Sequence, residues 1–444
     1  MPPIDLDKGK ELLGKLKKSV IDFYSLSSLH FIHLGDEGLV HFICILNSII
    51  ENINNASVEE LNSIYAIVLH KGAGKPIESH RAYRTISTCP VVAKALDYYM
   101  VDLYSQGWQD IQAETQFQGK DSSHELAALC ITEAATHSIT VNKQPMFALF
   151  LDAESTFDKV AVEQAVRCAY AAGTQDQGLL YLQKRLSSRL TYIEWQHELL
   201  GPIMDTVGLE QGGCASDKVY RLVNNEQLKV AQNSQLGVQL GLIEKGPVHE
   251  DEVLSSVGLA DDVALLANSM VNLKALLYLT DKYCQKYNVK LVSSKTKLLV
   301  FHSTKMIHEV MIDLLANPIE INGQRVEPSS SALYVGVVRS NEGNGPHISS
   351  RISAHRRSVF GLLNIGLGRK HYSNPAVSVK IDQIFSSQIL LSGLSCLSVT
   401  CMEEKMLDQY FKVYLERLFC LHQSSPSSFV FLLAGRLPCQ HNST

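Results

Sequence analysis

The sequence has no apolar run that approaches the length of about 18 residues with which a helix crosses a bilayer. The stretch from Ile43 to Ile50 is too short for this and is expected to lie in a core. The first residues, Met1 to Asp7, lack the pattern of a secretory signal. We therefore expect an intracellular protein, of the nucleus or the cytoplasm, with no membrane span.

Cysteine pairs at CxxC spacing are also missing, although the chain holds 10 cysteines. In an intracellular protein, cysteines scattered in this way are usually reduced and buried. Two pairs near the C-terminus, Cys420 with His422 and Cys439 with His441, are spaced more tightly than ordinary zinc ligands. Zinc at the C-terminus therefore stays a minor alternative.

The chain has no excess of positive charge. Its net charge of −5 argues against indiscriminate binding of nucleic acid. Two segments are nevertheless basic, since residues 345–371 contain no acid and residues 69–94 contain only Glu78. Their basic residues are Arg351, Arg356, Arg357, Arg369 and Lys370 in the first, and Lys71, Lys75, Arg81, Arg84 and Lys94 in the second. Taken alone, each segment is most simply a solvated basic face.

The length of 444 residues and the apolar content of 45% predict two or three packed lobes. Apolar residues at helical spacing predict helices over Leu12–Phe23 and Leu39–Ile50. Further helices are expected near His124–His137, Val160–Ala172, Asp217–Leu228 and Asn272–Tyr287, and through most of the chain from about residue 346. Short strands within residues 66–145 and a strand pair within 325–340 complete the pattern. Alternating strands and helices predict an α+β fold whose sheet carries helices on one face.

Two neighbouring acids, Asp261 and Asp262, stand inside the apolar segment from Val257 to Ala267. An Asp-Asp pair taken alone is most often a solvated turn. Here apolar and β-forming residues flank the pair on both sides, which predicts a hairpin with two like charges at its tip. Adjacent carboxylates are hard oxygen ligands that suit Mg²⁺.

A third acid, Asp152, ends the apolar run that begins at Phe147. An unbroken apolar run predicts a strand buried on both faces. Burying an unpaired acid at its end is costly, so Asp152 is expected to be either solvated or bound to a cation. A glycine-rich loop, Gly208 to Ser216, follows later and allows the backbone to approach a ligand closely.

These motifs occur in the order and rough spacing found in reverse transcriptases, and the chain most resembles those of non-LTR, LINE-like retrotransposons. The segment from Arg81 to Ser87 with Lys94 resembles the family's fingers motif. The segments Tyr287–Lys297 and Tyr334–Gly336 resemble the motif after the aspartate hairpin and the primer grip. The chain departs from the family pattern at Thr85, Thr156, Cys214 and Leu259, none of which is a metal ligand in the family.

The resemblance implies a right-hand polymerase fold. Residues 66–145 would form the fingers with part of the palm, and residues 146–340 the palm, with an antiparallel sheet. Residues 341–444 would form a helical thumb, and residues 1–65 would be an N-terminal helical extension.

The resemblance also assigns the catalytic residues. Asp152 and Asp261 would bridge two Mg²⁺ ions, for which Mn²⁺ can substitute, Asp262 would assist, and the Ala153 carbonyl would complete one coordination shell. Lys295 would protonate the leaving pyrophosphate; the alternative is an ordinary solvated lysine.

The substrate-binding residues are assigned in the same way. Arg84, with help from Lys75, would bind the triphosphate, because arginine is permanently charged and can bind in a bidentate manner. Gln211 and Gly212 would lie against the incoming nucleotide and the template base. Phe157 would exclude the ribose 2′-hydroxyl; the alternative is a core aromatic at a helix start.

The implied partners are an RNA template, a DNA primer, their hybrid duplex and deoxynucleoside triphosphates. The basic residues Arg351, Arg356 and Arg357 would contact the duplex through its backbone and shape.

We therefore predict an RNA-directed DNA polymerase that adds deoxynucleotides to a primer 3′-hydroxyl, from a non-LTR-type retroelement or a descendant of one. An RNA-templated RNA polymerase is an alternative, which the gate residue Phe157 disfavours. A second alternative is a catalytically idle, RNA-binding relic or maturase-like module. About 65 residues before the fingers are too few for the family's endonuclease, so we do not expect the chain to cut its own target. The sequence does not indicate an oligomeric state.

Overall fold

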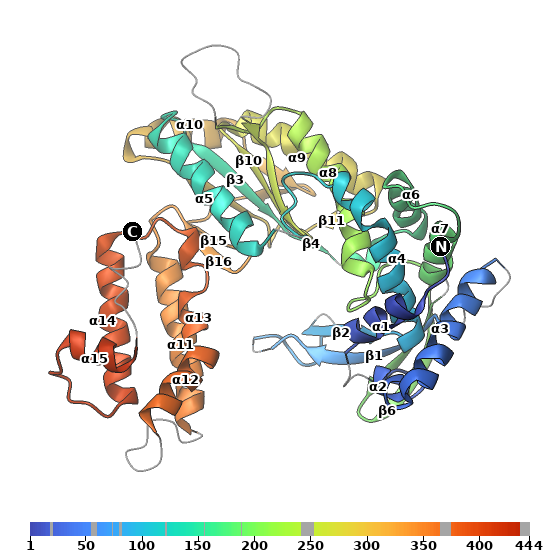
Figure 1. Ribbon diagram of the computed structural model, residues 1–444. Coiled ribbons are helices and arrows are strands. Elements are labelled where there is room, and N and C mark those ends of the chain that lie inside the picture. Colours follow the sequence, from blue (N-terminus) through green and yellow to red (C-terminus); the bar gives the residue numbers. More distant parts are fainter. Residues whose placement is uncertain are drawn as a thin grey trace. The chain divides into compact units, whose positions relative to one another are not determined.

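The computed structural model describes residues 1–17, 21–54, 60–72, 74–79, 82–119, 122–154, 156–187, 189–240, 253–364 and 374–435 (Figure 1). Among the residues discussed above, Arg81, Arg369, Lys370, Cys439 and His441 lie outside the described residues.

The contacts within the chain divide it into two compact units. The first unit comprises Met1–Gln116, Ala153–Val230 and Leu279–Lys290. The second comprises Phe117–Asp152, Ala231–Tyr278 and Leu291–Thr444. Each unit therefore gathers segments that are far apart in the sequence, and the division differs from the four contiguous segments expected above.

The first unit combines helices with a four-stranded sheet in the order β2-β1-β5-β6. The strands are β1 (Ser63–His70), β2 (Tyr83–Thr88), β5 (Arg189–Trp195) and β6 (Glu198–Asp205). The helices are α1 (Leu6–Lys15), α2 (Ser28–His33), α3 (Gly35–Glu51), α4 (Val91–Asp110), the 3₁₀ turn Phe157–Lys159, α6 (Val162–Ala171) and α7 (Asp176–Leu186). Strands β1 and β5 are parallel, whereas the other neighbours are antiparallel. The parallel pair joins residues that are more than 100 positions apart.

One predicted helix of this unit is shorter than expected. The apolar spacing predicted a helix from Leu12 to Phe23, but α1 ends at Lys15. The backbone is extended at Leu16, and farther along the Asp22 carboxylate accepts the backbone N–H groups of Tyr24 and Leu26, both at 2.9 Å. These local bonds compete with helical ones and favour a turn.

The second unit contains an antiparallel sheet in the order β12-β3-β10-β9. Its strands are β12 (Lys297–Phe301), β3 (Met146–Leu151), β10 (Asp262–Ala267) and β9 (Ser256–Leu259). Every residue of β3 is buried, as the apolar run predicted. Alanines and Ile131 of α5 (His124–Thr140) pack with Met146, Ala148 and Phe150 of β3 on one face (Figure 1). The mixed α+β class is thus confirmed.

Smaller elements complete the second unit and its borders. They are β4 (Ala153–Glu154), β7 (Val238–Gln239), β8 (Val253–Leu254), β11 (Lys290–Leu291), α10 (Ile307–Ala316), β13 (Ile319–Ile321), β14 (Gln324–Val326), β15 (Ser331–Tyr334) and β16 (Val337–Ser340). Two long helices, α8 (Ser216–Asn233) and α9 (Met270–Lys286), contribute residues to both units. The predicted strand pair at 325–340 corresponds to the hairpin of β15 and β16.

The C-terminal part of the second unit is helical, as predicted. It consists of α11 (Gly345–Asn364), α12 (Pro375–Phe385), α13 (Ser387–Leu391), α14 (Cys401–Leu418) and α15 (Ser427–Leu433). These helices share a core that includes Ile348, Leu390, Leu415 and Val430. Throughout the part of the chain that is described, no helix combines the length and the apolar character needed to cross a membrane.

Candidate active site

The predicted aspartate hairpin is present at the ends of β9 and β10. Asp262 pairs with Leu259 across the hairpin, so Ala260 and Asp261 form a two-residue turn. Ala260 has a positive φ of 55°, which such tight turns require. Both aspartates are exposed at this tip, because the apolar residues that follow, Val263 to Ala267, are the ones that enter the core.

Asp152 lies beside this hairpin. Because Leu151 pairs with Val263, the register brings Asp152, one residue further along β3, to the strand position of Asp262. The backbone of Asp152 is held by neighbouring groups: its N–H donates to the Thr296 hydroxyl at 3.3 Å, and its carbonyl accepts from Val292 at 2.8 Å. Two acids that are 110 positions apart in the sequence are therefore neighbours in the sheet.

The negative charges of three neighbouring aspartates determine the electrostatics of this site. The pKa of Asp262 is raised to about 6, chiefly because its carboxyl is partly removed from solvent and further because Asp261 and Asp152 are negatively charged. Lys295 lies beside Asp152, with its Nζ 3.0 Å from the Oδ1 oxygen of that residue. A set of hard carboxylate oxygens that repel one another is a suitable environment for a divalent cation.

The described residues contain no group of three or more His, Cys, Asp or Glu side chains arranged closely enough to hold a metal ion by themselves. The three aspartates thus influence one another electrostatically without forming a closed set of ligands. This arrangement fits an open site, in which the substrate's own oxygens would supply the remaining ligands.

The hydroxyl of Tyr334 is hydrogen-bonded to the backbone of the aspartate hairpin, a role that the sequence did not indicate. Its buried hydroxyl donates to the backbone carbonyl of Val257 at 3.0 Å and lies 3.4 Å from that of Asp262. Its segment was expected only as a primer-grip likeness. No pattern in a single sequence links Tyr334 to residues more than 70 positions away.

The glycine loop in the first unit is held by backbone hydrogen bonds on both sides. The N–H groups of Gly208 and Leu209 donate to the carbonyls of Val160 and Phe157, at 2.8 and 2.7 Å. The carbonyl of Gln211 accepts the N–H of Ser87, on β2, at 2.8 Å. The loop therefore connects the segment after Asp152 with the strand that carries Arg84.

Gly212 has to be a glycine at this place. Its φ is +107°, and a Cβ atom there would lie 2.9 Å from the carbonyl oxygen of Ser87. Both the backbone conformation and the space therefore exclude a side chain. Gly212 thus allows a close approach to the backbone of β2, and the predicted close approach of the loop to a ligand stays a prediction.

Phe157 is half-buried and stacks on Tyr220 of α8, with ring centroids 4.3 Å apart and planes at 17°. It also packs against the helical core of the first unit. This position is compatible with both readings of the residue, a gate and a core aromatic at a helix start.

The predicted cationic residues of the first unit are both exposed. Arg84 lies on β2 opposite Leu69, and Lys75 lies in the segment between β1 and β2. Ala153 begins β4, directly after Asp152 in the chain. The structure thus gathers Arg84, Phe157, Gln211 and Gly212 in the first unit, and the aspartates and Lys295 in the second.

The predicted duplex-binding arginines lie on α11, as a helix was expected there. Arg356 and Arg357 are exposed, whereas Arg351 is partly buried. The guanidinium of Arg356 lies over the ring of Tyr410 at 5.4 Å, which limits its freedom to swing.

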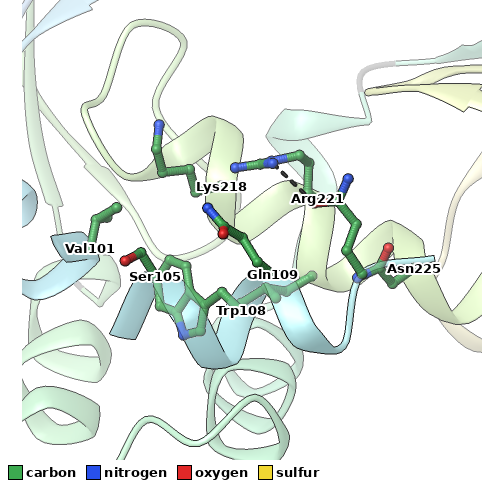
Figure 2. A pocket seen from close by; sticks show the side chains of 9 residues that line it. Val101, Ser105, Trp108, Gln109, Lys218, Arg221 and Asn225 are labelled. Atoms are coloured by element: carbon green, nitrogen blue, oxygen red, sulfur yellow. Dashed lines mark hydrogen bonds between the residues drawn. The ribbon is translucent and has the colours of Figure 1, made fainter. Parts of the chain in front are cut away.

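A small pocket between α4 and α8 in the first unit is lined by none of these residues (Figure 2). Its lining residues are Val101, Ser105, Trp108, Gln109, Gln112, Lys218, Arg221, Leu222 and Asn225. Its volume of about 50 Å³ admits only a few water molecules, each of which needs about 10–15 Å³ on this scale. It is therefore too small to be the site of a nucleotide.

Comparisons with known proteins agree with the motifs. The family model described as reverse transcriptase (RNA-dependent DNA polymerase) matches residues 71–338, more than half of the chain. No curated protein matches the sequence.

Two solved telomerase structures are similar at low identity. One is telomerase from Candida albicans in complex with a TWJ fragment of telomeric RNA, with 10% identity and a TM-score of 0.41 over 87% of this chain and 64% of that one. The other is apo telomerase from Candida tropicalis truncated from its C-terminal domain, with 9% identity and a TM-score of 0.42 over 68% of this chain and 59% of that one. The chain thus spans less than two thirds of either structure. On the match to its family model, the chain belongs to the reverse transcriptase family of RNA-directed DNA polymerases.

Proposed function

We propose that the chain is an active RNA-directed DNA polymerase of a non-LTR-type retroelement, or a descendant of one. It would extend the 3′-hydroxyl of a DNA primer on an RNA template. The observation that carries this proposal is the position of Asp152 and Asp262 at neighbouring strand ends, with Asp261 in the adjoining turn. Phosphoryl transfer needs several carboxylates at one place, and a relic under no selection would have no reason to keep them there.

In this proposal residues 66–145 act as fingers with part of the palm, 146–340 as palm and 341–444 as thumb, with residues 1–65 as an N-terminal extension. The sheet of β3, β9, β10 and β12 would be the floor of the palm. Because β5 and β6 continue the sheet of β1 and β2, residues 189–205 would work with the fingers.

The aspartates and the Ala153 carbonyl would hold two Mg²⁺ ions. When bound, such ions supply Lewis acidity to the attacking 3′-oxygen and to the leaving pyrophosphate. The chain's own contribution is to fix the carboxylates: the Thr296 hydroxyl and the Val292 amide hold the backbone of Asp152, and Tyr334 holds the hairpin.

Lys295 would deliver the proton that the pyrophosphate takes up as it leaves. Its ammonium group is already held at 3.0 Å from Asp152, and its side chain remains largely exposed. In this role Lys295 donates one N–H proton to a phosphate oxygen and later regains it from solvent.

We expect Phe157→Val to relax the selection for deoxynucleotides, because the smaller side chain would leave room for a 2′-hydroxyl. The preference for dNTP over rNTP, measured as the ratio of kcat/KM values in single-nucleotide extension, should fall roughly 10- to 100-fold. Tyr220→Leu is the matched control, since it removes the same stacking contact and leaves Phe157 in place. A lower melting temperature with an unchanged ratio in Phe157→Val would identify the residue as a core aromatic only.

We expect the double variant Arg356→Gln/Arg357→Gln to weaken binding of an RNA–DNA hybrid uniformly across sequences. Each lost phosphate contact should reduce the slope of log K against log salt by about one. Fluorescence anisotropy of a labelled hybrid at several salt concentrations measures this slope. Lys305→Gln, an exposed lysine outside α11, serves as the control, and an unchanged slope in the arginine variant would rule out α11 as the duplex contact.

Primer extension tests the proposed function directly. The wild type should extend an oligo(dT) primer on poly(rA) with Mg²⁺, and also with Mn²⁺. Folded protein that binds RNA but incorporates nothing with either ion would instead support the idle RNA-binding module. Ribonucleotide incorporation would support the RNA polymerase alternative.

A further inference from the structure

A buried arginine of the first unit, Arg185, contacts the glycine loop through the side chain of Glu210. Arg185, on α7, contacts both oxygens of Glu210: its Nη1 lies 2.7 Å from Oε1, and its Nη2 donates to Oε2 at 3.1 Å. Its Nε lies 3.6 Å from Asp97, on α4. The three side chains are only 4 to 5% exposed. One cation therefore joins two helices to the loop.

Glu210 immediately precedes Gln211, one of the two residues proposed to contact the nucleotide. Its Oε2 also accepts a hydrogen bond of 2.8 Å from the buried thiol of Cys89, which follows β2. Burial raises the pKa of this thiol well above its ordinary value, so Cys89 remains a donor. Glu210 is thus held from two sides, by α7 and by the end of the strand that carries Arg84.

A second arginine holds the other end of the loop. Arg189, at the start of β5, donates to the carbonyls of Val207 and Gly208, both at 2.7 Å. The loop from 207 to 212 is therefore fixed at its beginning by Arg189, in its middle by Arg185 and at its end by the contact of Gln211 with Ser87. The side chains that give this support, those of Arg185 and Arg189, are not proposed to touch substrate.

The charge distribution shows which ion pair dominates. Burial raises the pKa of Asp97 to about 6, despite the opposing effect of Arg185. Burial also disfavours the charged form of Glu210, but the charge of Arg185, with its hydrogen bond and that of Cys89, outweighs this and lowers the pKa of Glu210. Arg185 and Glu210 therefore form the ion pair that is retained when Asp97 takes up a proton.

Burying such a pair is a poor way to gain stability, because desolvation cancels much of the attraction and apolar side chains of similar volume often do as well. What a buried ion pair of this kind adds is a fixed geometry, because the guanidinium contacts both carboxylate oxygens and donates a hydrogen bond to one of them. Here the geometry it fixes is that of the backbone at Gln211 and Gly212.

We propose that Arg185 and Glu210 are positioning residues that set the place of Gln211 and Gly212 against β2 and thereby the affinity for the incoming deoxynucleoside triphosphate. The effect on affinity rests on the proposed function, whereas the effect on the loop does not. Neither residue is catalytic.

The test uses Arg185→Lys and Glu210→Gln, which largely keep size and polarity but lose the paired contacts between the guanidinium and the carboxylate. The apolar double variant Arg185→Met/Glu210→Met retains volume without a lone buried charge. Lys286→Gln and Glu226→Gln are matched controls, because they break an exposed ion pair of 2.5 Å in the same unit. All variants are compared as full-length chains by melting temperature, primer extension, and hydrogen exchange of peptides that cover residues 207–213.

We expect the KM for dNTP to rise roughly tenfold or more, with kcat changed much less and primer–template affinity unchanged. Amide exchange in 207–213 should accelerate in all three loop variants and in neither control. If the single variants do not fold, the double methionine variant should fold and show the same two effects. The proposal would be overturned if the Arg185 and Glu210 variants exchanged residues 207–213 at the wild-type rate. It would also be overturned if exchange were faster in these variants but their KM for dNTP were unchanged.

Failure of the proposed function has a different signature. A wild type that does not extend primers, yet shows faster loop exchange on substitution of Arg185 or Glu210, would reject the polymerase and support the positioning of the loop. A wild type that extends primers, combined with loop exchange that the substitutions do not change, would support the polymerase and reject the positioning of the loop.

Discussion

Asp261→Asn should abolish primer extension while leaving the protein at least as stable as the wild type. The substitution keeps the size of the side chain and removes one of three negative charges that converge at the ends of β3 and β10. Because like charges on neighbouring strands repel, their removal relieves the folded state. For the reaction the same charge is needed, and its loss should reduce kcat by about a thousandfold or more.

The measurement pairs two readouts on the same preparation. Extension of oligo(dT) on poly(rA) is followed with Mg²⁺ and with Mn²⁺, and the melting temperature is recorded without added metal. Asp152→Asn should also abolish extension, but it weakens the ion pair with Lys295, so no gain in melting temperature is expected. Glu320→Gln, an exposed acid of β13 in the same unit, should change neither readout.

Two results would contradict this account. Near-normal extension by Asp261→Asn would show that the hairpin acids are not part of the reaction. A large fall in melting temperature would show that the acids stabilise the tip, and that the charges there are paired more effectively than the pKa of Asp262 indicates.

The local parts of this site could be predicted from the sequence. The apolar run before Asp152 indicates a buried strand. The apolar and β-forming residues on both sides of Asp261 and Asp262 indicate a hairpin, because side-chain patterning within a few residues is enough for both. The helices α5, α6, α8 and α9 were predicted for the same reason, with ends that differ by a few residues. Such differences are usual, since helix ends depend on caps and on local competition.

The distant parts could not be predicted. The pairing of β1 with β5 and the contacts of Tyr334 join residues between 72 and about 130 positions apart, and nothing in either segment names its partner. From the sequence, Glu210 was recognised only as part of the glycine loop, and no role was predicted for it. Its pairing with Arg185 depends on the packing of α7 beneath that loop, which a single sequence does not encode in any recognisable pattern.

The second large effect is expected at Asp382, in the helical C-terminal part. Its fully buried carboxylate accepts hydrogen bonds from Ser386, Ser387 at 2.6 Å and Tyr414 at 2.7 Å, and His355 lies 3.9 Å away. Asp382→Ala would leave these buried donors without an acceptor. Removing one partner of such a cluster costs about 3–5 kcal/mol, so this variant should be strongly destabilised in the second unit.

The same carboxylate should make the second unit sensitive to acid. Burial opposes its charged form, but the nearby His355 and the hydrogen bonds from Ser386, Ser387 and Tyr414 outweigh burial and lower its pKa to about 2. An unfolded aspartate titrates near 4. The stabilisation is therefore complete above about pH 4 and is lost as the pH falls through about 2. The difference in stability between wild type and Asp382→Ala should shrink over this range.

The two units offer an internal control for this experiment. Both tryptophans, Trp108 and Trp195, belong to the first unit, so their fluorescence during urea unfolding reports on that unit alone. Hydrogen exchange of peptides from α12 and α14 reports on the second. Asp382→Ala should accelerate exchange in these two helices at pH 7, whereas Glu342→Ala, an exposed acid before α11, should not. If exchange in α12 and α14 stayed at the wild-type rate, the cluster would contribute little, and the helices would be held by the apolar core around Leu390 and Leu415 instead.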